Sequence, residues 1–362
     1  MRVTCAAAAI AMAQLHVAKL IEGVRPLEKH AHACGGGNIS VVTNKVWMYG
    51  ATWGPTLRLC CDGQRTRNCA AKDCVTWTQA HARQLELVEV LRRNVVHDAV
   101  ADVHVLLGEA DPVRRYLARL PWFERHGACK LRLVEIAGQR PSFKHYMQYI
   151  STSLLGRSVV LVNQDIFLAE GWERLPRMLA PPRTALLLSR YHRRVAYSTR
   201  HSAAAAWAEG LINASPPARG ALGGARTCDM TGGNMAVWKR SLCTAREHNF
   251  GSYDAYAMRL VAPLTAGQLD VFDYPQNAWG GENIFLYILQ EMLGLRMSNP
   301  CLTLVGVHMH CELPSSFGPS KVGDKRRGKK DVAVAVQAKM KKLGLTITLP
   351  PEKLGTLALR VE

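Results

Sequence analysis

The stretch Ser158-Val159-Val160-Leu161-Val162-Asn163-Gln164-Asp165-Ile166-Phe167 decides the fold that this sequence predicts. Its uncharged run of small and branched apolar residues is typical of a strand buried on both faces, and it stops at an acid, Asp165. In open α/β sheets, ligands bind just beyond the carboxyl ends of the strands. The stretch therefore predicts a buried strand that brings Asp165 to a binding cleft. The alternative is that Asp165 only caps a helix that starts near residue 170.

Strand and helix patterns alternate along the chain on both sides of this stretch. Apolar runs predict strands at residues 39–43, 102–107, 131–136 and 185–189. Helical spacing of apolar residues predicts helices at 78–96, 143–154 and 170–179, and a short helix that opens at Asp111-Pro112. This order predicts an α/β fold, a single large domain whose mostly parallel sheet is flanked by helices.

Composition describes an ordinary globular chain with a strong positive charge. The chain has 362 residues, 48% hydrophobic and 20% charged, and 46 Lys and Arg against 28 Asp and Glu give a net charge of +18. Such a charge favours polyanionic partners, which include nucleic acids, anionic membrane surfaces and phosphorylated small molecules. The densest basic cluster, residues 321–330, is expected to be a solvated loop or linker, with a nucleic-acid or targeting patch as the alternative.

The eleven cysteines form no C-x-x-C pair, so free thiols in a reducing compartment are the default expectation, which favours the cytoplasm. A zinc site or loop disulfides among Cys60, Cys61, Cys69 and Cys74 are the alternatives. The first 20 residues are expected to form an amphipathic helix, because their apolar run is too short and interrupted for a transmembrane span. A cleaved signal, and with it the secretory pathway, is the alternative.

Two segments after the central stretch carry candidate ligand-binding residues. Arg190 opens a basic run directly after a predicted strand, where it can meet a diphosphate, although a solvated strand end explains it equally well. Gly232-Gly233 precedes a short apolar strand, which lets the backbone approach a ligand closely, and Asn234 can then hydrogen-bond a sugar or phosphate. A plain tight turn is the alternative for this second segment.

Two further motifs lie nearer the end of the chain. Trp279-Gly280-Gly281-Glu282-Asn283 leads into a helix predicted at residues 284–293, with Glu282 in its first turn. An aromatic wall beside an acid is a common way to hold and activate sugar rings, whereas a simple capping carboxylate is the alternative. A strand predicted at residues 302–310 places His308 and His310 on one face, which suits a metal or a phosphate.

In this chain order, Asn163-Gln-Asp165, Gly232-Gly233, Trp279-Gly-Gly-Glu282 and His308-Met-His310 resemble the motifs of GT-A-fold glycosyltransferases. The Trp-Gly-Gly-Glu stretch is most similar to the β1,4-galactosyltransferase group. A closer resemblance is to glycosyltransferase-like proteins of this fold that share the patterns found here at residues 163–167, 188–191 and 299–310. The resemblance covers roughly residues 38–312, with residues 1–37 as a leader and 313–362 as a basic C-terminal extension.

The resemblance implies a nucleotide-sugar glycosyltransferase, with a UDP-sugar as donor and a glycan or protein as acceptor. Asp165 would bind Mn²⁺ or Mg²⁺ on the nucleotide diphosphate, together with His310 or, failing that, His308. Glu282 would act as the general base. The remaining donor and substrate residues would be Asn163, Arg190, Gly232, Gly233, Asn234, Trp279, Gly281 and Asn283.

Two residues depart from the family pattern. Asn163 replaces the first acid of the Asp-x-Asp motif, and Asn283 stands where galactosyltransferases carry the catalytic aspartate. These departures motivate one alternative, a catalytically inactive sugar- or nucleotide-binding protein of the same fold. The positive charge motivates another, a nucleic-acid-binding protein, although the sequence has no recognised motif for it. A nucleotidyltransferase is disfavoured, because residues 43–45 do not form a glycine-rich basic loop.

Overall fold

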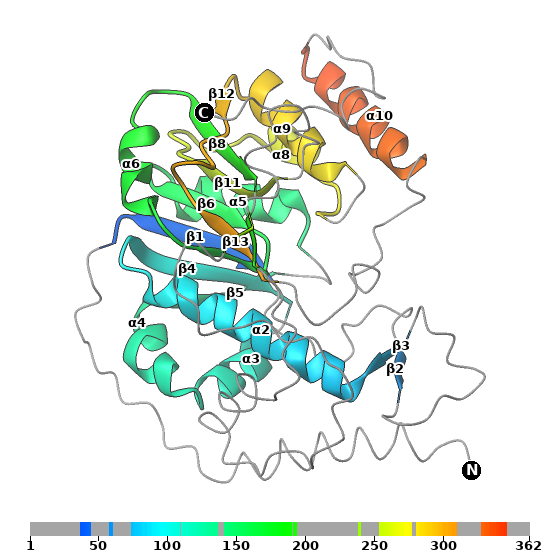
Figure 1. Cartoon of the computed structure of the whole chain (residues 1–362). Coiled ribbons are helices and arrows are strands. Elements are labelled where there is room, and N and C mark those ends of the chain that lie inside the picture. Colours follow the sequence, from blue (N-terminus) through cyan, green and yellow to red (C-terminus); the bar gives the residue numbers. More distant parts are fainter. Residues whose placement is uncertain are drawn as a thin grey trace, which may run out of the picture.

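The computed structural model describes residues 37–44, 58–60, 74–108, 110–136, 141–189, 191–193, 238–239, 253–276, 280–309 and 327–345. A seven-stranded sheet in the order β12-β8-β11-β6-β1-β4-β5 forms its centre (Figure 1). The strands are β1 (Ile39–Asn44), β4 (Val100–Leu107), β5 (Leu131–Glu135), β6 (Ser158–Val162), β8 (Thr184–Ser189), β11 (Tyr253–Met258) and β12 (Arg296–Ser298).

Strand direction in this sheet is mostly parallel. β1 pairs in parallel with β4 and β6, β4 with β5, and β12 with β8, whereas β11 runs antiparallel to both β6 and β8. The predicted α/β class with a mostly parallel sheet is therefore confirmed, with one antiparallel strand inserted between two parallel blocks.

Two smaller sheets accompany the central one. β7 (Ile166–Leu168), β9 (Tyr191–Arg193), β10 (Trp238–Lys239) and β13 (Gly306–His308) form a four-stranded sheet in the order β10-β9-β13-β7. β2 (Arg58–Cys60) and β3 (Cys74–Thr76) pair with each other. The first of these sheets matters for the site, because β7 follows directly on the turn after β6.

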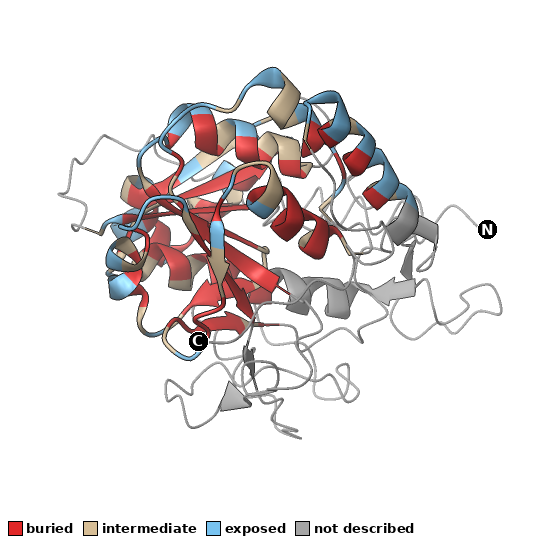
Figure 2. Cartoon of the chain, turned by 90° about the horizontal axis from the view of Figure 1, so that it is seen from above, coloured by how far each residue is buried: buried red, intermediate tan, exposed pale blue. Residues whose placement is uncertain are grey.

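Helices cover both faces of the central sheet. They are α2 (Trp77–Val96), α3 (Ala110–Leu117), α4 (Ala128–Lys130), α5 (Phe143–Ser153), α6 (Leu175–Met178), α8 (Ala266–Val271), α9 (Gly281–Glu291) and α10 (Arg327–Lys342), with a π-helix at Phe123–Gly127 and a 3₁₀ turn at Trp172–Arg174. Figure 2 shows buried strands at the centre and helices whose outer sides are exposed.

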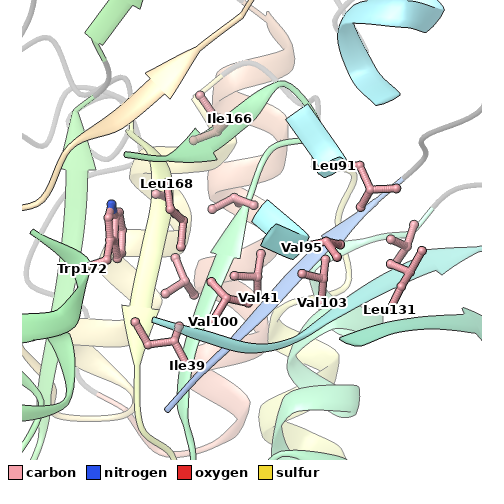
Figure 3. Packing of buried hydrophobic residues seen from close by; sticks show 14 of the residues in the cluster. Ile39, Val41, Leu91, Val95, Val100, Val103, Leu131, Ile166, Leu168 and Trp172 are labelled. Carbon is pink, nitrogen blue, oxygen red and sulfur yellow. The ribbon is translucent and has the colours of Figure 1, made fainter. Parts of the chain in front are cut away.

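Side chains alternate along each strand between two hydrophobic cores. Val41 and Val160 belong to the core under α2, α3 and α6, which Figure 3 shows with Leu91 and Val95 of α2 packed over the strands. Val42 and Leu161 belong to the core under α5, α8, α9 and α10. A strand with apolar residues at both alternating positions is therefore buried on both faces, as the run before Asn163 predicts.

The predicted helix at 143–154 is confirmed in its start, its buried side and its end. Ser142 forms a capping box with His145, and Phe143 and Tyr146 belong to the buried side. After the helix, Gly156 adopts a φ of 76°, a left-handed conformation that favours glycine. Local sequence signals were sufficient for this element.

The central strand is shorter than predicted. β6 ends at Val162, and residues 163–165 form a turn that is closed by a hydrogen bond from the backbone N–H of Ile166 to the carbonyl of Asn163. The apolar residues Ile166 and Phe167 then belong to β7 in the second sheet. Asp165 therefore lies in a turn between two sheets. The 3₁₀ turn of Trp172–Arg174 and α6 replace the single helix predicted at 170–179.

The strand predicted at residues 302–310 is also shorter. Only β13, Gly306–His308, is a strand, because Thr303 and Leu304 donate their backbone N–H groups to the carbonyl of Pro300 and curl the chain into a turn. Leu302 is 52% exposed as a result. The alternation of apolar residues over 302–310 therefore predicted extended backbone wrongly for the residues before Gly306.

Two further predictions are wrong. Cys129 and Cys301 are each disulfide-bonded, so the expectation of free thiols fails for both. The basic cluster at 321–330 was expected to be a loop, yet α10 begins at Arg327 and packs Ala333, Val336 and Met340 into the core under α8 and α9. Within the described ranges, none of the helices has the length and apolar character needed to cross a membrane.

Asn94 joins α2 to β7 and generates a prediction about stability. Its side chain, 1% exposed, donates to the carbonyl of Ile166 at 3.0 Å and accepts from the N–H of Leu168 at 2.9 Å. Asn94→Ala leaves both buried backbone groups unpaired and should lower the free energy of unfolding by about 2–4 kcal/mol in denaturant titration. Gln148→Ala on the exposed side of α5 is the control, with an expected change below about 0.5 kcal/mol. A loss as small as the control would contradict this role.

Candidate functional site

The order of strands creates a topological switch point at the carboxyl ends of β1 and β6. The chain runs outward from β1 through β4 to β5 and then returns to β6 on the other side of β1. At such a switch point the connections leave the sheet in opposite directions, and a crevice forms outside the strand ends. The turn at Asn163 begins at this position, directly after Val162.

Asn163 is held at the switch point by a chain of hydrogen bonds. Its side-chain nitrogen donates to Oδ1 of Asp254 at 2.6 Å, and its side-chain oxygen accepts from Nε2 of Gln276 at 2.9 Å. Gln276 in turn accepts from the hydroxyl of Tyr146 at 3.3 Å. Asp254 is 2% exposed, and its backbone carbonyl accepts from the N–H of Asn163 at 3.1 Å. Both ends of the Asn163 amide are therefore engaged by protein groups.

Asp165 and His308 lie in contact. Nε2 of His308 is 3.1 Å from Oδ2 of Asp165, and the two side chains are 12% and 13% exposed. The second sheet brings them together, because His308 on β13 pairs with Ile166 on β7, and the N–H of Met309 donates to the carbonyl of Asp165 at 2.8 Å. One carboxylate and one imidazole thus meet at the edge of the turn.

Glu282 lies in the first turn of α9, and Asn283 beside it is 5% exposed. Gly280 allows the sharp entry into this helix with a φ of 70°, and the hydroxyl of Tyr274 donates to the carbonyl of Gly281 at 3.3 Å. The positive end of the helix dipole favours a carboxylate at this position. Glu282 is partly accessible, whereas Asn283 is buried.

Tyr256 connects Glu282 to the network around Asn163. Burial is the largest cause that raises the pKa of the Tyr256 phenol, and the negative charges of Glu282 and Asp254 raise it further. Both carboxylates therefore act on the same buried ring, which also packs edge-on against Phe285 of α9 at 4.9 Å between centroids.

The structure brings together only some of the predicted site residues. Asp165 contacts His308. Asn163 donates a hydrogen bond to Asp254, and the charges of Asp254 and Glu282 both act on Tyr256. Gly281 and Asn283 lie beside Glu282 at the start of α9. Six predicted site residues lie outside the described residues: Arg190, Gly232, Gly233, Asn234, Trp279 and His310.

Sequence reasoning missed Asp254, Gln276 and the hydroxyl of Tyr146. Asp254 had a usable signal, because it is the only charged residue in the run Tyr253-Asp254-Ala255-Tyr256-Ala257-Met258. A lone acid in a buried strand needs a partner, which is the argument that singled out Asp165. Gln276 had no such signal, and Tyr146 was assigned to the buried stripe of α5 without a role for its hydroxyl.

Asp165 and His308 are the candidate ligands for a divalent cation. Among the described residues, no group of three or more His, Cys, Asp and Glu is arranged to hold a metal. Asp165 and His308 supply one oxygen and one nitrogen ligand. Mg²⁺ and related ions in phosphate-transfer sites use one or two carboxylates and take the remaining ligands from substrate phosphates and water. The pair therefore fits a cation that arrives with a diphosphate, and does not form a complete protein cage.

Comparisons with known proteins add little. No protein-family model matches the chain, and no curated protein matches its sequence. Among solved structures, the chain is similar to the mannosyltransferase PcManGT from Pyrobaculum calidifontis in complex with GDP-Man and Mn²⁺. The match has a TM-score of 0.35 and 13% identity, and covers 96% of this chain and 86% of that chain. Values this low do not establish a shared family.

The Asn163–Asp254 contact predicts a pH-dependent effect of restoring the acid at position 163. Asn163→Asp places two carboxylates in contact, which raises the pKa of one of them above its value in the unfolded chain. The folded state then binds more protons than the unfolded state, so stability is lost as the pH rises. We expect the free energy of unfolding to fall by about 1–3 kcal/mol at pH 7 and by less near pH 4.

Unfolding by denaturant at both pH values measures this effect. Gln148→Glu on the exposed side of α5 is the control for an added carboxylate and should show little change at either pH. Equal stability of the Asn163→Asp variant and the unsubstituted protein at pH 7 would show that the contact with Asp254 is unimportant.

Proposed function

We propose that this chain is a glycosyltransferase of the GT-A fold, which moves a sugar from a nucleotide-sugar donor to a hydroxyl acceptor with the help of Mn²⁺ or Mg²⁺. The observation that carries the proposal is the contact of Asp165 with His308 on the turn that follows β6 at the switch point of the sheet. Nucleotide ligands bind at such points in open α/β sheets. The resemblance of the motifs to glycosyltransferases favours a UDP-sugar as the donor and a glycan or protein as the acceptor.

Asp165 and His308 would hold the cation. When bound, the cation would neutralise the charge of the donor diphosphate. The carboxylate of Asp165 is kept in place by its contact with His308 and by the backbone bond from Met309. Asn163 and the network behind it would fix the shape of the turn, so that Asp165 does not need to reorganise when the donor binds.

Glu282 is the residue proposed as general base. In a direct displacement, the acceptor oxygen forms a bond to the anomeric carbon of the sugar and gives its proton to the Glu282 carboxylate. The bond between that carbon and the phosphate oxygen breaks, and its electron pair leaves with the nucleoside diphosphate. The configuration of the sugar is inverted. Glu282 is favoured over Asn283 for this role because it is ionisable and partly accessible.

The contact between Asn163 and Asp254 supports an active enzyme over an inactive one. An acid at position 163 would lie against the buried Asp254 carboxylate, whereas the amide of Asn163 donates to it. We therefore infer that Asn163 does not simply remove a charge from the site.

A panel of UDP- and GDP-linked sugars tests the proposed function. Purified protein is incubated with each donor, with Mn²⁺, with Mg²⁺ or with a chelator, and release of the nucleoside diphosphate is measured. We expect release from at least one donor, and expect the chelator to abolish it. Saturable binding of a nucleotide by calorimetry without hydrolysis or transfer would instead identify the inactive binding protein. Absence of both binding and turnover across the panel would exclude a nucleotide-sugar protein.

Substitution of the two proposed acids should separate their roles. Glu282→Gln should lower kcat by about 10²- to 10⁴-fold and leave nucleotide affinity unchanged, because a general base acts only in the transition state. Asp165→Asn should weaken metal-dependent nucleotide binding as well as turnover. Steady-state kinetics and calorimetry measure both effects. The controls are Glu173→Gln and Asp111→Asn, two exposed acids that are not among the proposed site residues. Full activity in either site variant would mean that the site is misplaced.

A further inference from the structure

A second candidate site lies at the opposite end of the central sheet. A cavity of about 340 Å³ opens at the amino ends of β1 and β6, and Asn38, Arg157, Ser158 and Arg259 are among its lining residues. This volume is at the lower end of the range for small-molecule sites. None of the described residues that line the cavity is acidic, and two of them are arginines.

The direction of the strands brings the two arginines together. Arg157 directly precedes β6, and Arg259 directly follows β11. Because β11 runs antiparallel to β6, with Met258 opposite Val159, the end of β11 lies at the start of β6. The backbone N–H of Gly156 donates to the carbonyl of Leu260 at 2.7 Å and closes this corner. The arginines are therefore neighbours in space although they are 102 positions apart in the chain.

Arg157 is held in place by a partly buried chain of polar side chains. Its guanidinium is 2.8 Å from Oδ2 of Asp102, Nε2 of His104 is 3.0 Å from Oδ1 of the same carboxylate, and Tyr149 contacts Nδ1 of His104 at 2.8 Å. Burial alone would raise the pKa of Asp102, but the nearby His104 and Ser40 side chains and the charge of Arg157 outweigh it and lower this pKa to about 2. An ionised carboxylate thus fixes the Arg157 side chain at the cavity.

The guanidinium of Arg259 has a buried N–H group that lacks a hydrogen-bond acceptor among the described residues. One terminal nitrogen donates to the hydroxyl of Ser158 at 3.2 Å. Its Nε is buried, and within the described part of the chain it has no hydrogen-bond partner. A buried guanidinium N–H without an acceptor is costly, and the negative charge of an anion in the cavity beside the guanidinium would offset part of that cost. The planar fork of an arginine matches the oxygens of a phosphoryl group.

We propose that this cavity binds a phosphoryl group, either free inorganic phosphate or the phosphate of a small phosphomonoester. Arg157 and Arg259 bring two positive charges, of which Asp102 balances one. Asn38 at the rim adds an amide that can donate to a phosphate oxygen. The site does not depend on the proposed transferase function, because it uses residues at the other end of the sheet.

Calorimetry of the full chain with inorganic phosphate tests the proposal, with chloride at equal ionic strength as the blank. We expect saturable binding at a stoichiometry of one. Arg259→Gln should weaken the affinity about tenfold or more, since it removes charge-assisted bonds to the anion. The matched control is Arg177→Gln, which removes the same charge from an exposed position on α6 next to the lining residue Pro176. That control should bind phosphate like the unsubstituted protein.

A second variant covers the possibility that Arg259→Gln does not fold. Asn38→Asp places a carboxylate at an exposed position of the lining without removing the bond between Arg259 and Ser158, and should weaken phosphate binding by repulsion. Tighter binding of glycerol phosphate than of inorganic phosphate would identify an ester as the ligand, and equal or weaker binding would identify free phosphate. Three results would overturn the proposal: no binding, an unchanged affinity in folded Arg259→Gln or Asn38→Asp, or an equal loss in Arg177→Gln.

Discussion

The antiparallel pairing of β11 with β6 and β8 is the constraint on which both ends of the central sheet depend. It places the first residues of β11 at the carboxyl end of β6, where Asp254 meets Asn163, and the residue after β11 at the amino end, where Arg259 meets Ser158. A parallel strand at this place would exchange the two ends. Asp254 would then lie at the amino end of β6 and Arg259 at its carboxyl end. Neither the Asn163–Asp254 bond nor the Arg259–Ser158 bond would form.

At the switch point, the buried carboxylate of Asp254 accepts a hydrogen bond from the neutral amide of Asn163. Removal of the Asp254 carboxylate from water is costly unless it accepts hydrogen bonds, and the side chain of Asn163 supplies one at 2.6 Å. Asn163 in turn is oriented by Gln276, and Gln276 by Tyr146. Three elements of the fold therefore hold one turn, and the turn positions Asp165 against His308. Asn163, one of the two residues that depart from the glycosyltransferase motifs, is held through both ends of its side-chain amide.

Sequence reasoning succeeded where the signal is local. The apolar run before Asn163 predicted β6, and the capping residue Ser142 together with an apolar stripe predicted α5, because caps and side-chain periodicity act within a few residues. It failed for β11, which was not predicted, and for the strand assigned to residues 302–310. Whether alternating residues form a strand depends on a partner strand, and the turn at Pro300 removes that partner for Leu302 and Leu304.

The sequence by itself determined the α/β class and the burial of the strands on both faces, since these follow from the order and period of its apolar runs. Only the tertiary structure decided which side chains meet. Asn163 and Asp254 are 91 residues apart, and Asp165 and His308 are 143 apart. Contacts over such separations depend on the order and direction of strands, which are set when whole elements pack on one another and not by any single segment.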